Sequence, residues 1–149
     1  VRHHQPQATM FATLFFGVLE LASGQLNYIN AGHFPPIVVS HNGEFTLLNP
    51  SGPLVGVTLD FPFNIEVIQL QMGDRLLAYT DGVIETPNPQ GELFGQARLM
   101  EMLAAPQSSV AASLEHIAVR LAEFSGGAPC ADDMTMLAVC RDFPTNTDH

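Results

Sequence analysis

The chain has 149 residues, and its 15 Asp and Glu side chains outnumber 5 basic ones, so the formal net charge is −10. That length suits one domain with its own core, and a hydrophobic content of 46% excludes a disordered tail. The scarcity of basic residues argues against nucleic acid and against an anionic membrane surface as partners. A phosphate group handled here would need positive charge from elsewhere, and a divalent cation held by carboxylates is the usual source.

The first half of the chain predicts a series of antiparallel strands. Pairing turns are expected at Ser23–Gly24 and at Asn42–Gly43, the second because both residues tolerate a positive φ. Residues 49–58, with two prolines and two glycines, predict an irregular loop. The strands themselves are expected at residues 11–21, 25–31, 37–40 and 44–48.

The second half predicts two more strands, then two helices and a last strand. The alternation of Phe63, Ile65 and Val67 with polar residues favours a strand with one solvated face. The apolar stripe of the second helix falls at spacings of four and three residues, and Ser108 or Ser109 can cap its start. We expect strands at 63–70, 75–80 and 134–141, a loop at 86–92, and helices at 94–104 and 109–124. This order predicts an α+β fold of one domain, not an alternating βαβ series.

Three carboxylates are candidate ligands for a metal ion. Asp81 ends an apolar strand and is followed by Gly82, while Asp132 and Asp133 directly precede another apolar strand. An aspartate at the end of a strand is held rigidly yet can face a cleft, which suits a hard cation. The alternative is that these side chains only accept hydrogen bonds from turn amides, and the spacing leaves both interpretations open.

The other candidate residues carry weaker signals. His33 lies in a Gly-His-Phe-Pro-Pro turn, where it could line a site or be structural. Cys130 and Cys140 have no metal-type spacing, so we interpret them as free thiols in a reducing compartment, with a disulfide left open. No segment reaches the roughly 18 apolar residues of a membrane span, so we expect no membrane contact from this segment and a cytoplasmic location.

Five segments, taken in order, resemble one protein family. They are FATLFFGVLE at 11–20, GQLNYINAGH at 24–33, GDRLLAYTDGV at 73–83, ELFG at 92–95 and DDMTML at 132–137. Together they resemble the bacterial SpoIIE/RsbU-type serine/threonine phosphatases of the metal-dependent PPM (PP2C-like) superfamily. The resemblance covers nearly the whole chain, and five motifs in one order are far more specific than any one of them.

The resemblance implies a β-sandwich flanked by helices, in an α-β-β-α order, with a two-metal Mn²⁺ or Mg²⁺ centre. It implies that Asp81 and Asp132 are metal ligands and carry catalysis, that Asp133 contributes less surely, and that Gly82 lets the backbone pass close to the site. His33 lies in the family's Asn-Ala-Gly-His-x-Pro-Pro signature without an assigned role. In such a centre, metal-activated water attacks phosphorus without a phospho-enzyme. The implied substrate is a phosphorylated regulatory protein of the anti-sigma-factor antagonist type.

One family segment has no counterpart in the chain. The first metal-binding segment, Asp-x-x-Gly-His-Gly on an early strand, is absent from the 149 residues. We therefore expect residues 1–149 to form a single phosphatase domain that lacks its N-terminal strands and first helix, and to be inactive in isolation. The parent protein could be tethered to a membrane through a missing N-terminal region. An uncovered sheet edge favours a homodimer, and a non-catalytic binding module or an inactive fragment are the alternative functions.

Overall fold

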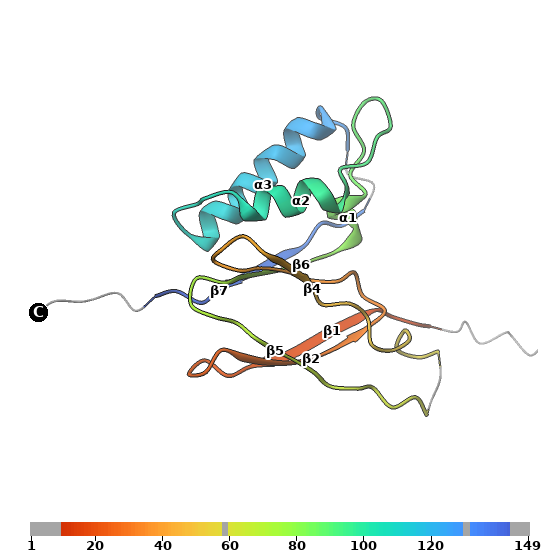
Figure 1. Cartoon of the computed structure of the whole chain (residues 1–149). Coiled ribbons are helices and arrows are strands. Elements are labelled where there is room, and N and C mark those ends of the chain that lie inside the picture. Colours follow the sequence, from red (N-terminus) through yellow and green to blue (C-terminus); the bar gives the residue numbers. More distant parts are fainter. Residues whose placement is uncertain (1–9, 58–59, 130–131, 144–149) are drawn as a thin grey trace, which may run out of the picture.

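The computed structural model describes residues 10–57, 60–129 and 132–143, and its elements form three layers (Figure 1). A three-stranded sheet is one outer layer, a four-stranded sheet lies in the middle, and the helices cover the free face of the four-stranded sheet. This arrangement confirms the predicted α+β class.

The outer sheet is antiparallel, with the strand order β1-β2-β5. Its strands are β1 (Leu14–Leu19), β2 (Gln25–Ala31) and β5 (Glu66–Gln69). The second strand has the predicted bounds, whereas the first and third are shorter than predicted. The strands β1 and β2 pair along their whole length, from Leu14 opposite Ala31 to Leu19 opposite Leu26.

The middle sheet is also antiparallel, with the order β4-β3-β6-β7. Its strands are β3 (Ile37–Val39), β4 (Phe45–Leu47), β6 (Arg75–Tyr79) and β7 (Met136–Cys140). The hairpin predicted at Asn42–Gly43 joins β3 to β4, and Gly43 has a φ of 89°, in the region that favours glycine. Strands β6 and β7 lie side by side although about sixty residues separate them, with Tyr79 opposite Met136.

Three helices follow β6 along the chain: α1 (Asp81–Ile84), α2 (Gly95–Ala104) and α3 (Val110–Ser125). The cap of α3 is Ser109, whose side chain accepts a hydrogen bond from the Ala112 amide, and the helix ends at Gly126 in a left-handed conformation. The short helix α1 was not predicted, because four residues are too few to show a helical period. It begins at the candidate ligand Asp81.

Two hydrophobic cores lie on the two faces of the middle sheet. One packs the helices against β3 and β6, through side chains that include Leu77, Tyr79 and Ile117. The other fills the space between the two sheets and includes Leu26 and Leu76. Since Leu76 and Leu77 are neighbours on β6 and point to opposite faces, the middle sheet is buried on both sides, as its apolar sequence predicts.

The third strand of the outer sheet corrects one prediction about side-chain orientation. The register between β2 and β5 sets Ile68 opposite Leu26, and both face the inter-sheet core. Alternation then turns Val67 outward, where it is 60% exposed, and Ile65 is 66% exposed. The apolar face expected to be buried is therefore the solvent-facing one.

The outer face of the three-stranded sheet is apolar and bare in the part of the chain that is described. Its exposed side chains include Phe16 and Val18 of β1 beside Ile65 and Val67. The helices of the described residues all lie on the other side of the molecule (Figure 1).

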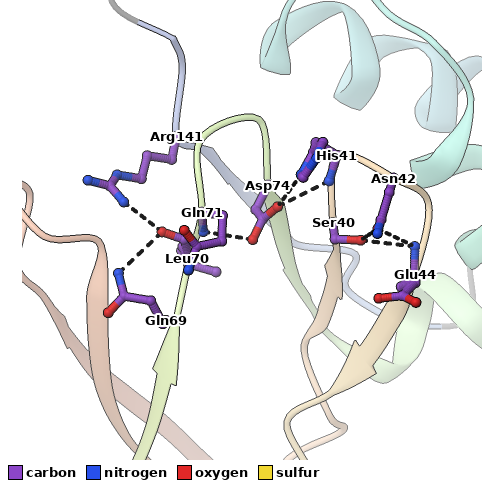
Figure 2. A network of polar contacts seen from close by, with 9 residues as sticks. All are labelled: Ser40, His41, Asn42, Glu44, Gln69, Leu70, Gln71, Asp74 and Arg141. Carbon is purple, nitrogen blue, oxygen red and sulfur yellow. Dashed lines mark hydrogen bonds and ion pairs between the residues drawn. The ribbon is translucent and has the colours of Figure 1, made fainter.

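A polar network joins the two sheets at the end remote from Asp81 (Figure 2). The carboxylate of Asp74, only 4% exposed, accepts hydrogen bonds from the backbone amides of His41 and Gln71. The guanidinium of Arg141, which follows β7, donates to the carbonyls of Leu70 and Ala22 at 2.8 Å each. These bonds tie the hairpin of the outer sheet to the middle sheet.

Candidate metal site at the ends of strands β6 and β7

The candidate site lies where β6 ends and β7 begins. Because the two strands are antiparallel and paired, the residue after β6 and the residues before β7 meet at one edge of the sheet. Asp81 is the first residue of α1, directly after β6, and is partly buried. Asp132 and Asp133 precede β7 and are exposed. The structure thus brings together the two chain segments that carry the three aspartates.

Thr80 connects the two segments of the site. Its backbone amide donates to the Thr135 carbonyl at 3.0 Å, continuing the ladder between the strands. Its hydroxyl donates to the Asp133 carbonyl at 3.0 Å and accepts from the Thr135 amide at 2.9 Å. The sequence alone does not single out Thr80, although it stands in the same Thr-Asp-Gly segment as Asp81.

Gly82 allows the two segments to approach each other closely. It is buried, and a Cβ atom at this position would lie 2.6 Å from the carbonyl oxygen of Asp133 and 3.3 Å from that of Asp132. The contacted atoms belong to the backbone, so they cannot move away as the tip of a side chain could. A close backbone approach at Gly82 is therefore present, and its part in a metal site stays a prediction.

The aspartates use part of their oxygen atoms locally. Asp81 Oδ1 accepts from the Gly82 amide at 3.0 Å, and Asp132 Oδ1 accepts from the Asp133 amide at 2.8 Å. These are the turn-amide bonds of the alternative interpretation, and they hold each carboxylate in place. Within residues 10–57, 60–129 and 132–143, no group of three or more His, Cys, Asp or Glu side chains is close enough to hold a metal ion. Mg²⁺ is commonly bound through only one or two carboxylates and keeps several waters, so it does not require three protein ligands.

His33 reaches the same corner of the molecule from the outer sheet. Its Nε2 lies 3.1 Å from the carbonyl oxygen of Tyr79, the last residue of β6. Its backbone amide donates to the side chain of Asn30, which is completely buried and also donates to the Leu48 carbonyl. The sequence left open whether this histidine is structural or lines a site. In the structure its ring contacts Tyr79, which precedes Asp81 by two residues in the chain.

An apolar cavity of about 450 Å³ lies beside the acidic segment, defined as Asp132 and Asp133. The helix α3 and the residues that follow Asp133 form its walls, including Leu121, Met134 and Met136. Thr86, whose hydroxyl donates to the Gly82 carbonyl, is at its rim. A second cavity of about 300 Å³, which Arg75 and Asp142 line, lies at the opposite end of β6 and β7.

The arginines of the described chain are engaged away from the aspartates. Their partners are the Ala104 and Ala105 carbonyls for Arg75, Glu92 and the Leu93 and Phe94 carbonyls for Arg98, Glu123 for Arg120, and the Ala22 and Leu70 carbonyls for Arg141. None of these four arginines therefore forms a hydrogen bond or ion pair with Asp81, Asp132 or Asp133.

The remaining sequence expectations concern thiols and membranes. Cys140 forms no disulfide with another described residue, and burial, followed by the nearby Asp142, raises the pKa of its thiol to about 11. Cys130, the other cysteine of the sequence, lies outside the described residues. Among the described residues, no helix has both the length and the apolar character needed to cross a membrane.

The comparisons with known proteins agree on one family. The family model "Stage II sporulation protein E (SpoIIE)" matches residues 1–142. Protein IcfG of Synechocystis is 41% identical over 133 residues, which are 89% of this chain and 21% of that protein. The phosphoserine phosphatase RsbU of Bacillus subtilis is 25% identical over 138 residues, which are 90% of this chain and 40% of RsbU.

A solved structure gives the same result for the fold. The SiaA-PP2C domain of Pseudomonas aeruginosa superimposes with a TM-score of 0.69 at 25% identity, covering 79% of this chain and 47% of that one. The chain therefore spans less than half of these three proteins. Its match to the family model extends over nearly its whole length, and its fold is PP2C-like. The chain belongs to the SpoIIE family, whose members are serine/threonine phosphatases of the PPM (PP2C-like) superfamily.

Proposed function

We propose that this chain supplies the Asp81 and Asp132 ligands of a metal-dependent phosphatase centre that hydrolyses phosphoserine or phosphothreonine on a regulatory protein. The observation that carries the proposal is the close approach of the two segments that carry these aspartates, with Gly82 allowing the approach and Thr80 joining the segments. Membership of the family supports the reaction class.

The residues present fit a hard divalent cation, Mn²⁺ or Mg²⁺, because all their donors are carboxylate oxygens. Asp81 and Asp132 would hold the ion through the oxygens that the local amide bonds leave open, and Asp133 is available beside them. The bound ion supplies Lewis-acid chemistry, lowering the pKa of a coordinated water and offsetting phosphoryl charge. The chain itself orients the carboxylates. Because it has few basic side chains, we assign the binding of the phosphate group to the metal ion.

The proposed substrate is a phosphorylated protein of the anti-sigma-factor antagonist type. The support is the family resemblance together with the similarity to RsbU, which is a phosphoserine phosphatase. The apolar cavity beside Asp133 is suited to an apolar side chain of such a protein, next to the phosphorylated residue. We propose a cytoplasmic site of action, with no nucleic acid and no membrane contact from this segment.

The test is release of phosphate from a phosphoserine protein by the full-length product of the gene, with and without Mn²⁺. We expect turnover that depends on Mn²⁺ or Mg²⁺ and falls at least 100-fold in Asp81→Asn and Asp132→Asn, because a neutral amide is a poor ligand for a hard cation. Glu115→Gln, on the exposed side of α3, is the control and should retain full activity. Metal-independent turnover, or equal rates in the aspartate variants, would contradict the proposal.

A second candidate function is a non-catalytic PPM-like binding module. The observation that favours it is that the described residues contain no cluster of three potential ligands, and the Asp-x-x-Gly-His-Gly segment is absent from the 149 residues. This function requires binding of a partner protein without metal and unchanged affinity after Asp132→Ala. Pull-down with EDTA present distinguishes it from catalysis.

We further propose that residues 1–149 act as one incomplete phosphatase domain, inactive by itself, and that its uncovered apolar face favours a homodimer. The support is the exposure of Phe16, Val18, Ile65 and Val67 on one sheet face. Sedimentation equilibrium of the 149-residue chain tests the dimer. A monomer at 100 µM would contradict it.

A further inference from the structure

We propose that His33 is a positioning residue for the candidate metal site. Its imidazole fixes the carbonyl end of β6 and, through it, the place of Asp81 two residues further along. The inference deepens the proposed function and rests on it, because the position of Asp81 matters for catalysis only if this aspartate is a ligand. Three hydrogen bonds and the strand register carry the argument.

Both nitrogen atoms of the imidazole have a partner. Nε2 lies 3.1 Å from the Tyr79 carbonyl oxygen, which can only accept, so Nε2 carries the proton. In the neutral imidazole Nδ1 is then the acceptor, and the hydroxyl of Thr13 at 3.1 Å can donate to it. The backbone amide of His33 donates to Asn30 at 2.9 Å. The tautomer and the orientation of the ring are therefore set by the surrounding residues.

The strand β6 needs this donor because of the prolines before β3. Ile37 pairs with Leu77, and in an antiparallel ladder the next equivalent pair would set Pro35 opposite Tyr79. Proline has no backbone N–H, so the backbone of this segment has no donor for the Tyr79 carbonyl. The ladder with β3 ends at Ile37, and the imidazole of His33 supplies the missing hydrogen bond from the side.

The carbonyl of Tyr79 lies two residues before Asp81, so its position affects where Asp81 lies. The next residue, Thr80, holds the acidic segment through its hydroxyl, and Asp81 follows it. On one side of β6, the residues before β7 hold this corner through the hydrogen bond from the Thr80 amide to the Thr135 carbonyl. On the other side, His33 is the donor to Tyr79 among the described residues. Without it, the corner would be held from one side only.

Amide hydrogen exchange of the 149-residue chain tests the inference without metal. We expect His33→Ala to speed exchange of the Thr80, Gly82 and Val83 amides about fivefold, which corresponds to the loss of one hydrogen bond of ordinary strength. His33→Gln should restore most of the protection, because a glutamine amide can donate where Nε2 does. The control is Ile68→Ala in the inter-sheet core, which lowers overall stability without touching this corner.

Two results would overturn the inference: unchanged exchange at these amides in His33→Ala, or a uniform increase across the chain like that of the Ile68→Ala control. A Mn²⁺ titration, followed by paramagnetic broadening of the Gly82 amide, links the result to the site. We expect His33→Ala to weaken Mn²⁺ binding about fivefold, and Ile68→Ala and His33→Gln to leave it near wild type. Equal weakening in His33→Ala and Ile68→Ala would also contradict a positioning role.

The titration separates failure of this inference from failure of the proposed function. Broadening in the wild type that Asp81→Asn abolishes supports the metal centre. An absence of broadening in the wild type contradicts ligation by this chain, and the exchange measurements then still decide whether His33 holds the β6 corner.

Discussion

The substitution Gly82→Ala tests the close approach on which the candidate site depends. The added Cβ would lie 2.6 Å from the Asp133 carbonyl oxygen, about 0.8 Å inside the shortest ordinary van der Waals distance of 3.4 Å. Moving the acidic segment away by that amount would stretch the 3.0 Å bond from the Thr80 hydroxyl to the same oxygen beyond 3.5 Å. The substitution therefore crowds the corner and removes a hydrogen bond.

The expected loss of stability follows from these two effects. Overpacking against atoms that cannot rotate away costs about 1–3 kcal/mol, and the lost hydrogen bond about 1 kcal/mol. Alanine is more favourable than glycine inside a helix by about 1 kcal/mol, and Gly82 has no positive φ. This helix propensity offsets part of the loss of stability. We expect Gly82→Ala to lower the free energy of unfolding by about 1–3 kcal/mol and to weaken Mn²⁺ binding.

Urea denaturation measures the free energy of unfolding. The midpoint concentration of urea is compared between variant and wild type, provided that the slope m is the same for both. The matched control is Gly17→Ala, in which the new Cβ meets the Cδ1 atom of Leu26 at 2.9 Å. That atom is the tip of a flexible side chain, so the cost should stay below about 1 kcal/mol. Wild-type stability and wild-type Mn²⁺ affinity in Gly82→Ala would refute the reasoning, and so would equal losses in the two variants.

Three further predictions concern the corner, the remote network and the thiol. Thr80→Val removes the hydroxyl that joins the segments of the site, so it should cost about 1–2 kcal/mol in urea denaturation, and Thr80→Ser should recover most of this loss. Asp74→Asn turns a buried acceptor of two amides into a partial donor and should cost about 1–3 kcal/mol, whereas the exposed Asp60→Asn should be neutral within about 0.5 kcal/mol. Because burial raises the pKa of Cys140 to about 11, its alkylation in a Cys130→Ser variant should rise about tenfold per pH unit from pH 8 to pH 10. A plateau below pH 9.5 would contradict the raised pKa.

The sequence determined the class of fold, most of its strands and the residues of the candidate site. Alternation and turn residues located β2 at its observed bounds, and the 3.6-residue period located α3 with its Ser109 cap. Five ordered motifs indicated the family, and Asp81 and Asp132 stand within two of them. These features depend on neighbours in the chain, which is why the sequence by itself expresses them.

Only the tertiary structure decided which residues hold the site together. The bonds of Thr80 to the segment before β7 span more than fifty residues, and the bond of His33 to Tyr79 spans forty-six. The outward orientation of Val67 likewise follows from the register between β2 and β5. Strand pairing fixes register through contacts remote in sequence, so no local pattern contains it. The sequence thus indicated the aspartates, and the pairing of β6 with β7 brought together the two segments that carry them.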